Sequence, residues 1–232
     1  MENQALHIAN GIVNLPVSLA FLGVALVVLA ICVARARDQL DERFVPMAGL
    51  VAAFIFAAQM LNFPVLPGVS GHLLGGALAA LLVGPWVGTL CVAIVLVVQA
   101  LLFADGGVTA IGLNVTNMAV IGTAAAYLVI AFLLKVLPQT LGGLALTGFL
   151  AGLVSTVAAS LGFVLQYALG GATSMPIGWV LGAMTGIHAL IGIGEGVITA
   201  LTVVAVARVR PDLVYALRAR SAPANPEVVT AA

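Results

Sequence analysis

Two histidines stand in sequence contexts that could support chemistry. His7 lies near the N-terminus, and His72 lies in the stretch from Pro64 to Gly76, which contains two prolines and four glycines. Those residues interrupt helices, so we expect an irregular backbone there. Neutral imidazole suits nickel, copper, zinc or cobalt, and a planar set of nitrogens suits Ni(II) or Cu(II). If the fold brings His7 and His72 together, they predict a transition-metal site; the alternative is that His72 is a polar residue with no ligand role.

The composition of the chain identifies an integral membrane protein. Of its 232 residues, 63% are hydrophobic and 7% are charged, and the mean hydropathy is +1.25. Soluble domains, in contrast, carry roughly 25% charged residues. Eight basic and eight acidic residues give no net charge and therefore no attraction to nucleic acid. The two cysteines lie in apolar stretches without CxxC spacing, so neither a disulfide framework nor a zinc site is expected.

Seven apolar segments predict an all-α membrane protein, a polytopic bundle of about seven transmembrane helices. They are Leu15–Ala34, Pro46–Asn62, His72–Val83, Trp86–Phe103, Ile111–Val136, Gly142–Leu169 and Met175–Ala207. The first exceeds the apolar core of a cleavable signal peptide, so we expect it to remain as a span. The third is too short to cross ~30 Å of hydrocarbon. It should lie among its neighbours and end at Gly84-Pro85, because proline cannot continue a helix.

The basic residues predict the orientation of the bundle. With seven crossings, all eight arginines and lysines fall on one side, which should be cytoplasmic. The N-terminus is then outside and the C-terminus cytoplasmic. Residues 1–13 form an N-terminal extension and metal-binding segment, residues 14–207 the transmembrane domain, and residues 208–232 a basic cytoplasmic tail that we expect to be disordered.

The same topology gathers polar side chains at the outer ends of five segments, of which the third contributes His72 and the other four contribute asparagine and glutamine. They are Gln59, Asn62, Gln99, Asn114, Asn117 and Gln166, with Asp105 in an outer turn. Polar groups in apolar surroundings need partners, so this belt indicates a pocket that is open outward and closed inward. The alternative is ordinary polar decoration of helix ends. Because Asp105 is the only acid in the belt, a calcium or magnesium site is disfavoured.

The seventh segment contains two ionisable residues and several spaced glycines. His188 and Glu195 are seven positions apart, about 10.5 Å along a helix axis, so they cannot both bind one ion on a straight helix. We expect each to form a hydrogen bond inside the bundle, with support or gating of the site as the alternative. Glycines four residues apart predict close helix approach, either within the bundle or against a partner. They are Gly148 with Gly152, Gly178 with Gly182 and Gly186, and Gly192 with Gly196.

The sequence contains no GxxxxGK[ST] pattern of nucleotide-binding loops, so we expect this chain to hydrolyse no nucleotide. No acid lies within the membrane at the expected site to couple transport to protons. Transport would therefore need energy from another protein. A stand-alone secondary transporter of a divalent transition metal is an alternative that would predict inverted repeats. A membrane-embedded metalloenzyme is less favoured, because it would need a general base and Glu195 lies too far inward. We expect no enzymatic activity.

Several stretches match one family. Leu6-His7-Ile8-Ala9-Asn10-Gly11 resembles the Met-His-Ile-x-x-Gly opening of the CbiM/NikM family, the substrate-binding membrane subunits (S components) of energy-coupling-factor (ECF) nickel and cobalt transporters. The stretch Ser70-Gly71-His72-Leu73-Leu74-Gly75-Gly76 is also similar to that family, as are residues 57–64, 99–107 and 188–196. The resemblance extends from residue 6 to about residue 207.

The resemblance implies a metal ion in a nearly square-planar ring of four nitrogens. Three come from the chain start: the terminal amine, the backbone nitrogen of the second residue and its imidazole. The fourth is the imidazole of the Ser-Gly-His loop. Carried over, the imidazoles are His7 and His72, and the backbone nitrogen is that of His7. The amine would belong to Leu6, yet Met1–Ala5 precede it. Either the mature chain starts at Leu6, which we favour, or the extension alters the site.

The resemblance also implies partners and a location. The partners are an ECF transmembrane coupling subunit, two cytoplasmic ATPase subunits and, in some systems, a small auxiliary membrane subunit, in the cytoplasmic (inner) membrane of a bacterium. Ni(2+) or Co(2+) would be captured from outside as transported substrate, with no bound cofactor; square-planar nitrogen coordination favours nickel. The side chains expected around the ligands are Asn62, Ser70, Asp105, Asn114, Asn117 and His188.

Overall fold

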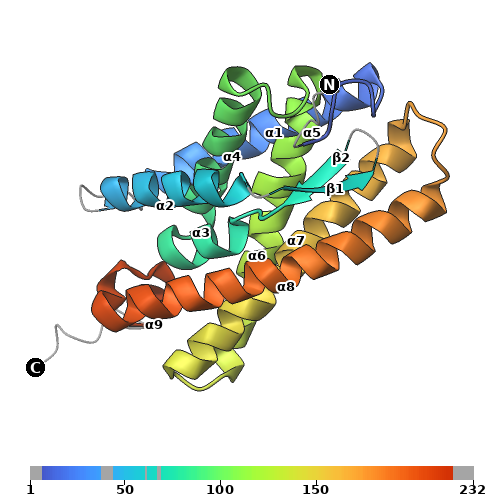
Figure 1. The fold of residues 1–232 in the computed structure, drawn as a ribbon. Coiled ribbons are helices and arrows are strands. Elements are labelled where there is room, and N and C mark those ends of the chain that lie inside the picture. Colours follow the sequence, from blue (N-terminus) through green and yellow to red (C-terminus); the bar gives the residue numbers. More distant parts are fainter. Residues whose placement is uncertain (1–6, 38–43, 61, 67–68, 222–232) are drawn as a thin grey trace, which may run out of the picture.

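The structure is a computed structural model that describes residues 7–37, 44–60, 62–66 and 69–221. Within these residues the chain is an elongated bundle of helices with one small β-hairpin (Figure 1). The elements before the middle of the chain are α1 (Leu15–Ala36), α2 (Phe44–Gln59), β1 (Asn62–Leu66), β2 (Val69–His72), α3 (Gly76–Val83) and α4 (Pro85–Leu102). Those after it are η1 (Val108–Ala110), α5 (Ile111–Asn114), η2 (Val115–Gly122), α6 (Thr123–Val136), α7 (Leu141–Gly170), α8 (Ile177–Val209), η3 (Pro211–Leu213) and α9 (Tyr215–Ser221).

Each of the seven predicted apolar segments contains a helix, which confirms the polytopic all-α class. Five helical stretches in the described chain are long and apolar enough to cross a membrane: α1, α4, the continuous stretch Val108–Val136, α7 and α8. The other two are shorter, because α2 has 16 residues and α3 has eight. The number of crossings and their orientation stay predictions.

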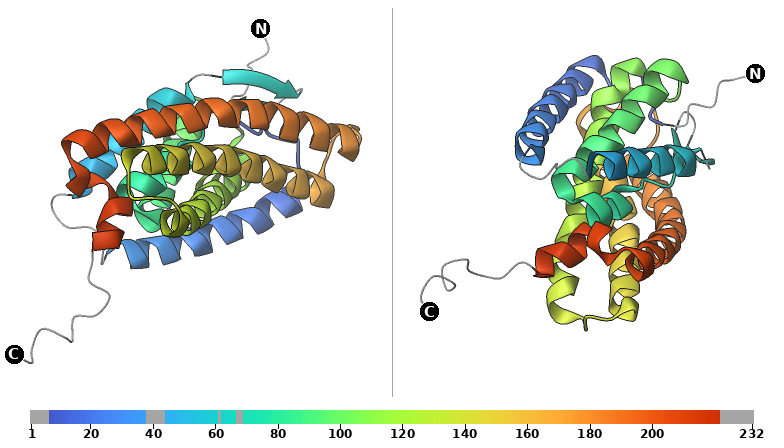
Figure 2. Two further views of the ribbon diagram at one scale, coloured as in Figure 1. Left: turned by 90° about the horizontal axis from the view of Figure 1, so that it is seen from below. Right: turned by 90° about the vertical axis from the view of Figure 1, so that its left-hand side faces the viewer.

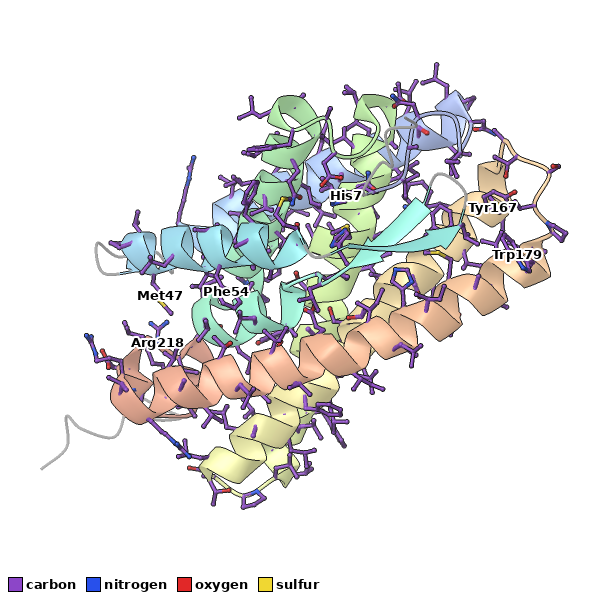
Figure 3. The ribbon with its side chains drawn as sticks, viewed as in Figure 1. His7, Met47, Phe54, Tyr167, Trp179 and Arg218 are labelled. Carbon is purple, nitrogen blue, oxygen red and sulfur yellow. The ribbon has the colours of Figure 1, made fainter. Side chains whose placement is uncertain are left out.

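Large apolar side chains cover the outer surface of the bundle, the reverse of what a soluble protein presents to water. Leu128, Leu190 and Leu201 are each more than two-thirds exposed. Figure 3 shows Phe54 on α2 and Trp179 near the start of α8, and both are exposed. Hydrocarbon imposes no penalty on such a surface, so the pattern fits a protein surrounded by lipid.

Helix α3 lies in the middle of the bundle, as its short apolar sequence predicts. All eight of its residues are buried. Gly84 ends the helix with φ of 86°, and Pro85 then begins α4, so the predicted break between the third and fourth segments is confirmed. A continuous helix from His72 to Phe103 does not form.

The tail differs from the sequence prediction. Residues 208–221 are ordered: α8 continues to Val209, and η3 and α9 follow. Val214 and Ala216 are buried, and the ring of Tyr215 packs on Gly84. These apolar residues anchor the segment beneath α3, although the many arginines around them suggested a solvated tail. Residues 222–232, for which we also expected disorder, lie outside the described residues.

The segment around His72 is also more regular than predicted. Strands β1 and β2 form an antiparallel hairpin with Asn62 opposite His72 and Phe63 opposite Gly71. The second helix therefore ends at Gln59 rather than Asn62, and the third begins at Gly76 rather than His72. Pro64 breaks a helix but is tolerated in a two-stranded ribbon, where each strand has an edge that needs no donor.

The spaced glycines divide into two groups. Those on α7 and the second half of α8 face each other, and the two helices run side by side (Figure 2). A Cβ on Gly152 would lie 2.9 Å from the Cα of Gly196, and one on Gly148 would lie 3.4 Å from that of Ala200. These glycines serve packing within the bundle. Gly178, Gly182 and Gly186 have no atom of the described chain within 4 Å of such a Cβ.

Replacing Gly152 with alanine should therefore destabilise the fold. The added methyl would press on the backbone of Gly196, and such overpacking typically costs about 1–3 kcal/mol. Thermal unfolding in detergent should show a lower midpoint for Gly152→Ala. The matched control is Gly182→Ala, which adds a methyl in open space and should leave the midpoint unchanged or slightly higher. Equal midpoints for the two variants would contradict the packing described here.

Candidate metal-binding site

The segment that carries His7 is inserted into one end of the bundle. His7 is 3% exposed, and Ile8, Ile12 and Val13 are buried with it. Backbone hydrogen bonds tie the end of this segment to α7: Asn14 N donates to the carbonyl of Gly170, and the carbonyl of Ile12 accepts from Ala172. The segment thus consists of two buried pairs, His7-Ile8 and Ile12-Val13, on either side of an exposed turn at Asn10 and Gly11.

The turn after α4 lies directly against this segment. Gly106 has φ of 91°, and a Cβ there would lie 2.9 Å from the Cβ of His7. The next glycine, Gly107, lies even closer to Asn10, and its N–H donates to the carbonyl of Ile8 at 2.9 Å. Two glycines in succession therefore allow the turn to approach the chain start, and they place Asp105 beside His7.

The structure brings His7, Asp105 and His72 together. Nδ1 of His7 donates to Oδ1 of Asp105 at 2.6 Å, and both side chains are buried. The ring centroids of His7 and His72 are 4.5 Å apart, with 56° between the ring planes. Residues 65 positions apart in the sequence therefore place their imidazoles in contact.

The free nitrogens of both rings follow from their hydrogen bonds. A carbonyl oxygen can only accept, so Nδ1 of His72 donates to the carbonyl of Leu73 at 2.7 Å, and Nε2 keeps its lone pair. Nε2 of His7 is buried and has no hydrogen-bond partner within the described chain. His72 belongs to the hairpin rather than to a spanning helix. Burial lowers the pKa of His72 to about 3, and the nearby His7 has a smaller effect in the same direction. A neutral imidazole of this kind can bind a metal.

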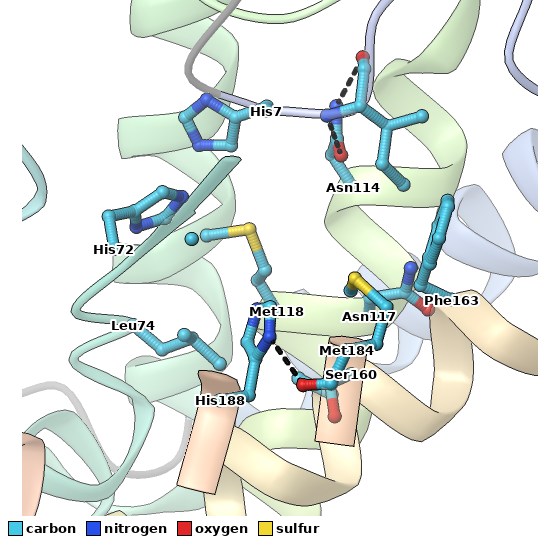
Figure 4. Close-up of a pocket in the computed structure, with 13 residues that line it drawn as sticks. His7, His72, Leu74, Asn114, Asn117, Met118, Ser160, Phe163, Met184 and His188 are labelled. Atoms are coloured by element: carbon cyan, nitrogen blue, oxygen red, sulfur yellow. Dashed lines mark hydrogen bonds between the residues drawn. The ribbon is translucent and has the colours of Figure 1, made fainter. Parts of the chain in front are cut away.

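A cavity of about 40 Å³ lies between these histidines and the helices behind them (Figure 4). Its lining includes His7, His72, Asn114, Asn117 and His188, and the sulfur-bearing side chains of Met118 and Met184. Its volume suffices for a single ion or for one or two water molecules. The cavity is therefore of the size expected for a small inorganic substrate and not for an organic one.

Asn114 and Asn117 reach the cavity from a distorted helix. The chain is α-helical through Asn114, becomes a π-helix over Val115–Gly122 and returns to α-helix at Thr123. Asn114 accepts from the backbone N–H of Ile8 at 3.2 Å, which holds the histidine-bearing segment. Asn117 donates to Gln166 at 2.7 Å, and its own oxygen is buried without a partner in the described chain. Helix distortions of this type are frequent at functional sites.

His188 was expected to form a hydrogen bond inside the bundle and was also expected near the proposed ligands. In the structure its Nδ1 donates to the carbonyl of Met184 at 2.8 Å, and the ring lines the same cavity as His7 and His72. The described residues contain no group of three or more His, Cys, Asp or Glu side chains that could hold a metal ion. Three imidazoles thus share the cavity without enclosing one position as a complete ligand set.

Other residues of the predicted polar belt have different positions. Gln59 lies outside the cavity lining and donates to the carbonyl of Leu74 at 2.8 Å. Gln99 is fully buried, and neither of its side-chain polar atoms has a partner within the described chain. Leu6 and the side chains of Asn62 and Ser70 lie outside what the structure describes.

These features define an integral membrane protein that holds a small, histidine-lined site at one end of its bundle. A family described as "CbiM: Cobalt uptake substrate-specific transmembrane region" matches residues 7–213. The chain belongs to this family. It is a membrane component of nickel or cobalt transport and not an enzyme.

Individual relatives agree with this assignment. The chain is 37% identical to a protein of Archaeoglobus fulgidus named as a fused nickel transport protein, NikMN, over 90% of this chain and 68% of that protein. It is 38% identical to a protein of Haloquadratum walsbyi named as a metal transport protein, over 90% and 94% of the two chains. The crystal structure of a truncated transition metal transporter superposes with a TM-score of 0.81 at 27% identity, covering 87% of this chain and 98% of that one.

Removing the Asp105 carboxylate should destabilise the metal-free protein. In Asp105→Ala, Nδ1 of His7 stays buried without its acceptor, which typically costs about 1–3 kcal/mol. Denaturant unfolding in detergent measures this loss. Asp212→Ala is the matched control, because it removes a carboxylate paired with Arg210 on the exposed surface and should change stability little. Similar losses of unfolding free energy in both variants would show that the buried His7–Asp105 bond stabilises the protein no more than the exposed Arg210–Asp212 pair does.

Proposed function

We propose that this chain is the substrate-binding subunit of an ATP-driven, ECF-type uptake system and that His7 and His72 bind the captured nickel or cobalt ion. The observation that supports this most directly is the contact between the two imidazoles, whose centroids are 4.5 Å apart at a buried cavity. Borderline divalent ions of this series prefer neutral imidazole nitrogen. His72 presents such a nitrogen, Nε2, away from its oxygen partner, whereas Nδ1 of His7 is bonded to Asp105.

The remaining ligands would come from the start of the chain. The backbone nitrogen and the imidazole of one histidine can bind the same ion only through Nδ1, because this atom closes a six-membered ring. In the structure Nδ1 of His7 faces Asp105. Binding through the chain start would therefore require Asp105 to release His7, after which the backbone nitrogen of His7 and the amine of Leu6, in a chain that begins there, would complete a planar set. Such a set favours nickel over cobalt.

The ion would reach the site from outside the cell. Strand β2, which ends at His72, lies nearer the start of α8, and α9 lies at the opposite end of α8 (Figure 1). Arg35 and Arg208 are in the last turns of α1 and α8, at the end that also carries α9. Basic residues concentrate on the cytoplasmic side of membrane proteins, which supports the proposal that the site opens to the outer face of a bacterial cytoplasmic membrane.

The energy for release would come from partner proteins. Glu195 is the only acid within the five long helices, and both of its carboxylate oxygens accept backbone hydrogen bonds. Within these helices no other acid is available for proton coupling, which argues against a stand-alone secondary transporter with acids at the membrane midplane. We assign the driving force to an ECF coupling subunit with two cytoplasmic ATPases and, where present, a small auxiliary membrane subunit.

Alanine substitution of the two proposed ligands tests this function. His7→Ala and His72→Ala should each weaken Ni(2+) binding to the purified protein by about 100-fold or more, because loss of groups that merely orient ligands already costs roughly 10–100-fold. Isothermal titration calorimetry and metal analysis after gel filtration measure the effect. His188→Ala removes an imidazole that lines the cavity without being a proposed ligand, so it should lose less than either of them, at most about 10- to 100-fold. Stoichiometric metal in both proposed-ligand variants would show that the ion binds elsewhere.

The start of the chain can be tested separately. Intact-mass analysis of protein from its native host shows whether the mature chain begins at Met1 or at Leu6. A shortened chain that begins at position 6, with Leu6→Met as its initiator, should bind Ni(2+) more tightly than the full sequence, because a free amine is a better ligand than an acylated nitrogen. Equal affinity for the two chains would remove the amine from the proposed ligand set.

A further inference from the structure

One buried carboxylate in the membrane-spanning part of the bundle has no role in the proposed ligand set. Glu195 lies in the middle of α8 and is 2% exposed. Its Oε2 accepts from the N–H of Leu74 at 2.6 Å, and its Oε1 accepts from the N–H of Gly75 at 2.7 Å. Within the described chain no arginine or lysine forms an ion pair with it. A buried acid without a cation is expensive unless its oxygens are satisfied, and here two backbone amides satisfy them.

Those amides belong to the residues that follow His72. The carbonyl of Leu73 accepts from Nδ1 of His72, so the ring orientation of His72 depends on the same short segment. Gln59 binds this segment from α2, donating to the carbonyl of Leu74. The backbone between the hairpin and α3 is therefore held by two side chains, from α8 and from α2, and its geometry sets the direction of the His72 ring.

The segment has little support of its own. Gly75 has φ of 80°, so the chain turns sharply there before α3 begins at Gly76. The side chain of Ile55 fills the space beside Gly75. The backbone N–H groups of Leu74 and Gly75 precede the regular hydrogen bonds of α3. The first of these bonds runs from the N–H of Ala79 to the carbonyl of Gly75. Without Glu195 these two amides would be buried donors without an acceptor.

Helix α8 connects this contact with the far end of the molecule. It has 33 residues, and its packing with α7 is the most extensive in the bundle. His188, on the same helix, lines the cavity, whereas Glu195 lies about 10.5 Å farther along, toward Arg208. A shift or rotation of α8 would therefore move the acceptors that hold the His72 segment.

We propose that Glu195 is a positioning residue for metal binding: its carboxylate fixes the backbone after His72, and a displacement of α8 acts on the bound ion through this contact. The inference rests on the proposed function, because it needs His72 to be a ligand. In this view a displacement of α8 lowers the affinity of the site for the ion and so promotes its release. Glu195 itself does not touch the ion.

The test uses the full chain in detergent and Ni(2+) alone as the probe. Glu195→Gln keeps the shape of the side chain but places an NH2 group against a backbone N–H, so one of the two bonds is lost. We expect Ni(2+) affinity to fall by about 10- to 100-fold, the range found when groups that orient metal ligands are removed. The dissociation rate of Ni(2+) should rise, and the visible absorption of the bound ion should change because the His72 nitrogen is displaced.

A matched control separates positioning from general stability. Ser155→Ala removes another buried side-chain-to-backbone hydrogen bond, from Ser155 to the carbonyl of Gly122, at a residue outside the cavity lining. It should lower the unfolding temperature and leave affinity, dissociation rate and absorption unchanged. Glu195→Asp retains the charge with a shorter reach and should fall between wild type and Glu195→Gln. If Glu195→Gln does not fold, the same measurements on Glu195→Asp decide the question.

A double substitution tests whether the effect passes through His72. In a His72→Ala background, adding Glu195→Gln should not weaken the residual Ni(2+) binding further, because a positioning residue loses its effect with the group it positions. Additive losses would overturn the inference, and so would wild-type affinity and dissociation rate in Glu195→Gln. If His72→Ala itself binds like wild type, the proposed function fails first; if His72→Ala loses binding and Glu195→Gln does not, only the role of Glu195 is refuted.

Discussion

Polar groups buried in this bundle must find partners within the protein, because lipid offers none, and this constraint determines the site. The clearest case is the bond between His7 and Asp105, which joins the beginning of the chain to the turn after α4. Its two side chains come from segments that share no regular secondary structure. The glycines after Asp105 allow the two backbones to approach, and Asn114 binds the same segment from the next helix. The segment that begins at His7 is thus part of the interior of the bundle.

The sequence was most informative where hydropathy and helix breaking decide the structure. The seven apolar segments and the break at Gly84-Pro85 were read correctly, because both follow from the solvation of side chains and from the missing N–H of proline. The approach of His7 to His72 was predicted from their shared face and from a family resemblance, and the structure places the two rings in contact. Whether they bind a metal is for the variants above to answer.

Other features depended on tertiary contacts that no local pattern encodes. The hairpin before α3 was expected to be irregular, because proline and glycine signal a break but not how the broken segments pair. For His188 the sequence left a local hydrogen bond and support of the site as alternatives, because access to the cavity depends on how α8 is rotated against its neighbours. The helical segment at residues 208–221 was missed because the burial of Val214 and Ala216 depends on tertiary packing.

The π-helical stretch Val115–Gly122 has a consequence for the side chains before and after it. A π turn accommodates more chain per turn than an α turn, so the stretch works as an insertion within a helix that is otherwise α-helical. The extra chain is taken up locally, so the α-helical turns on either side keep nearly the register of an uninterrupted helix. Asn114 can therefore line the cavity while α6 packs against α7.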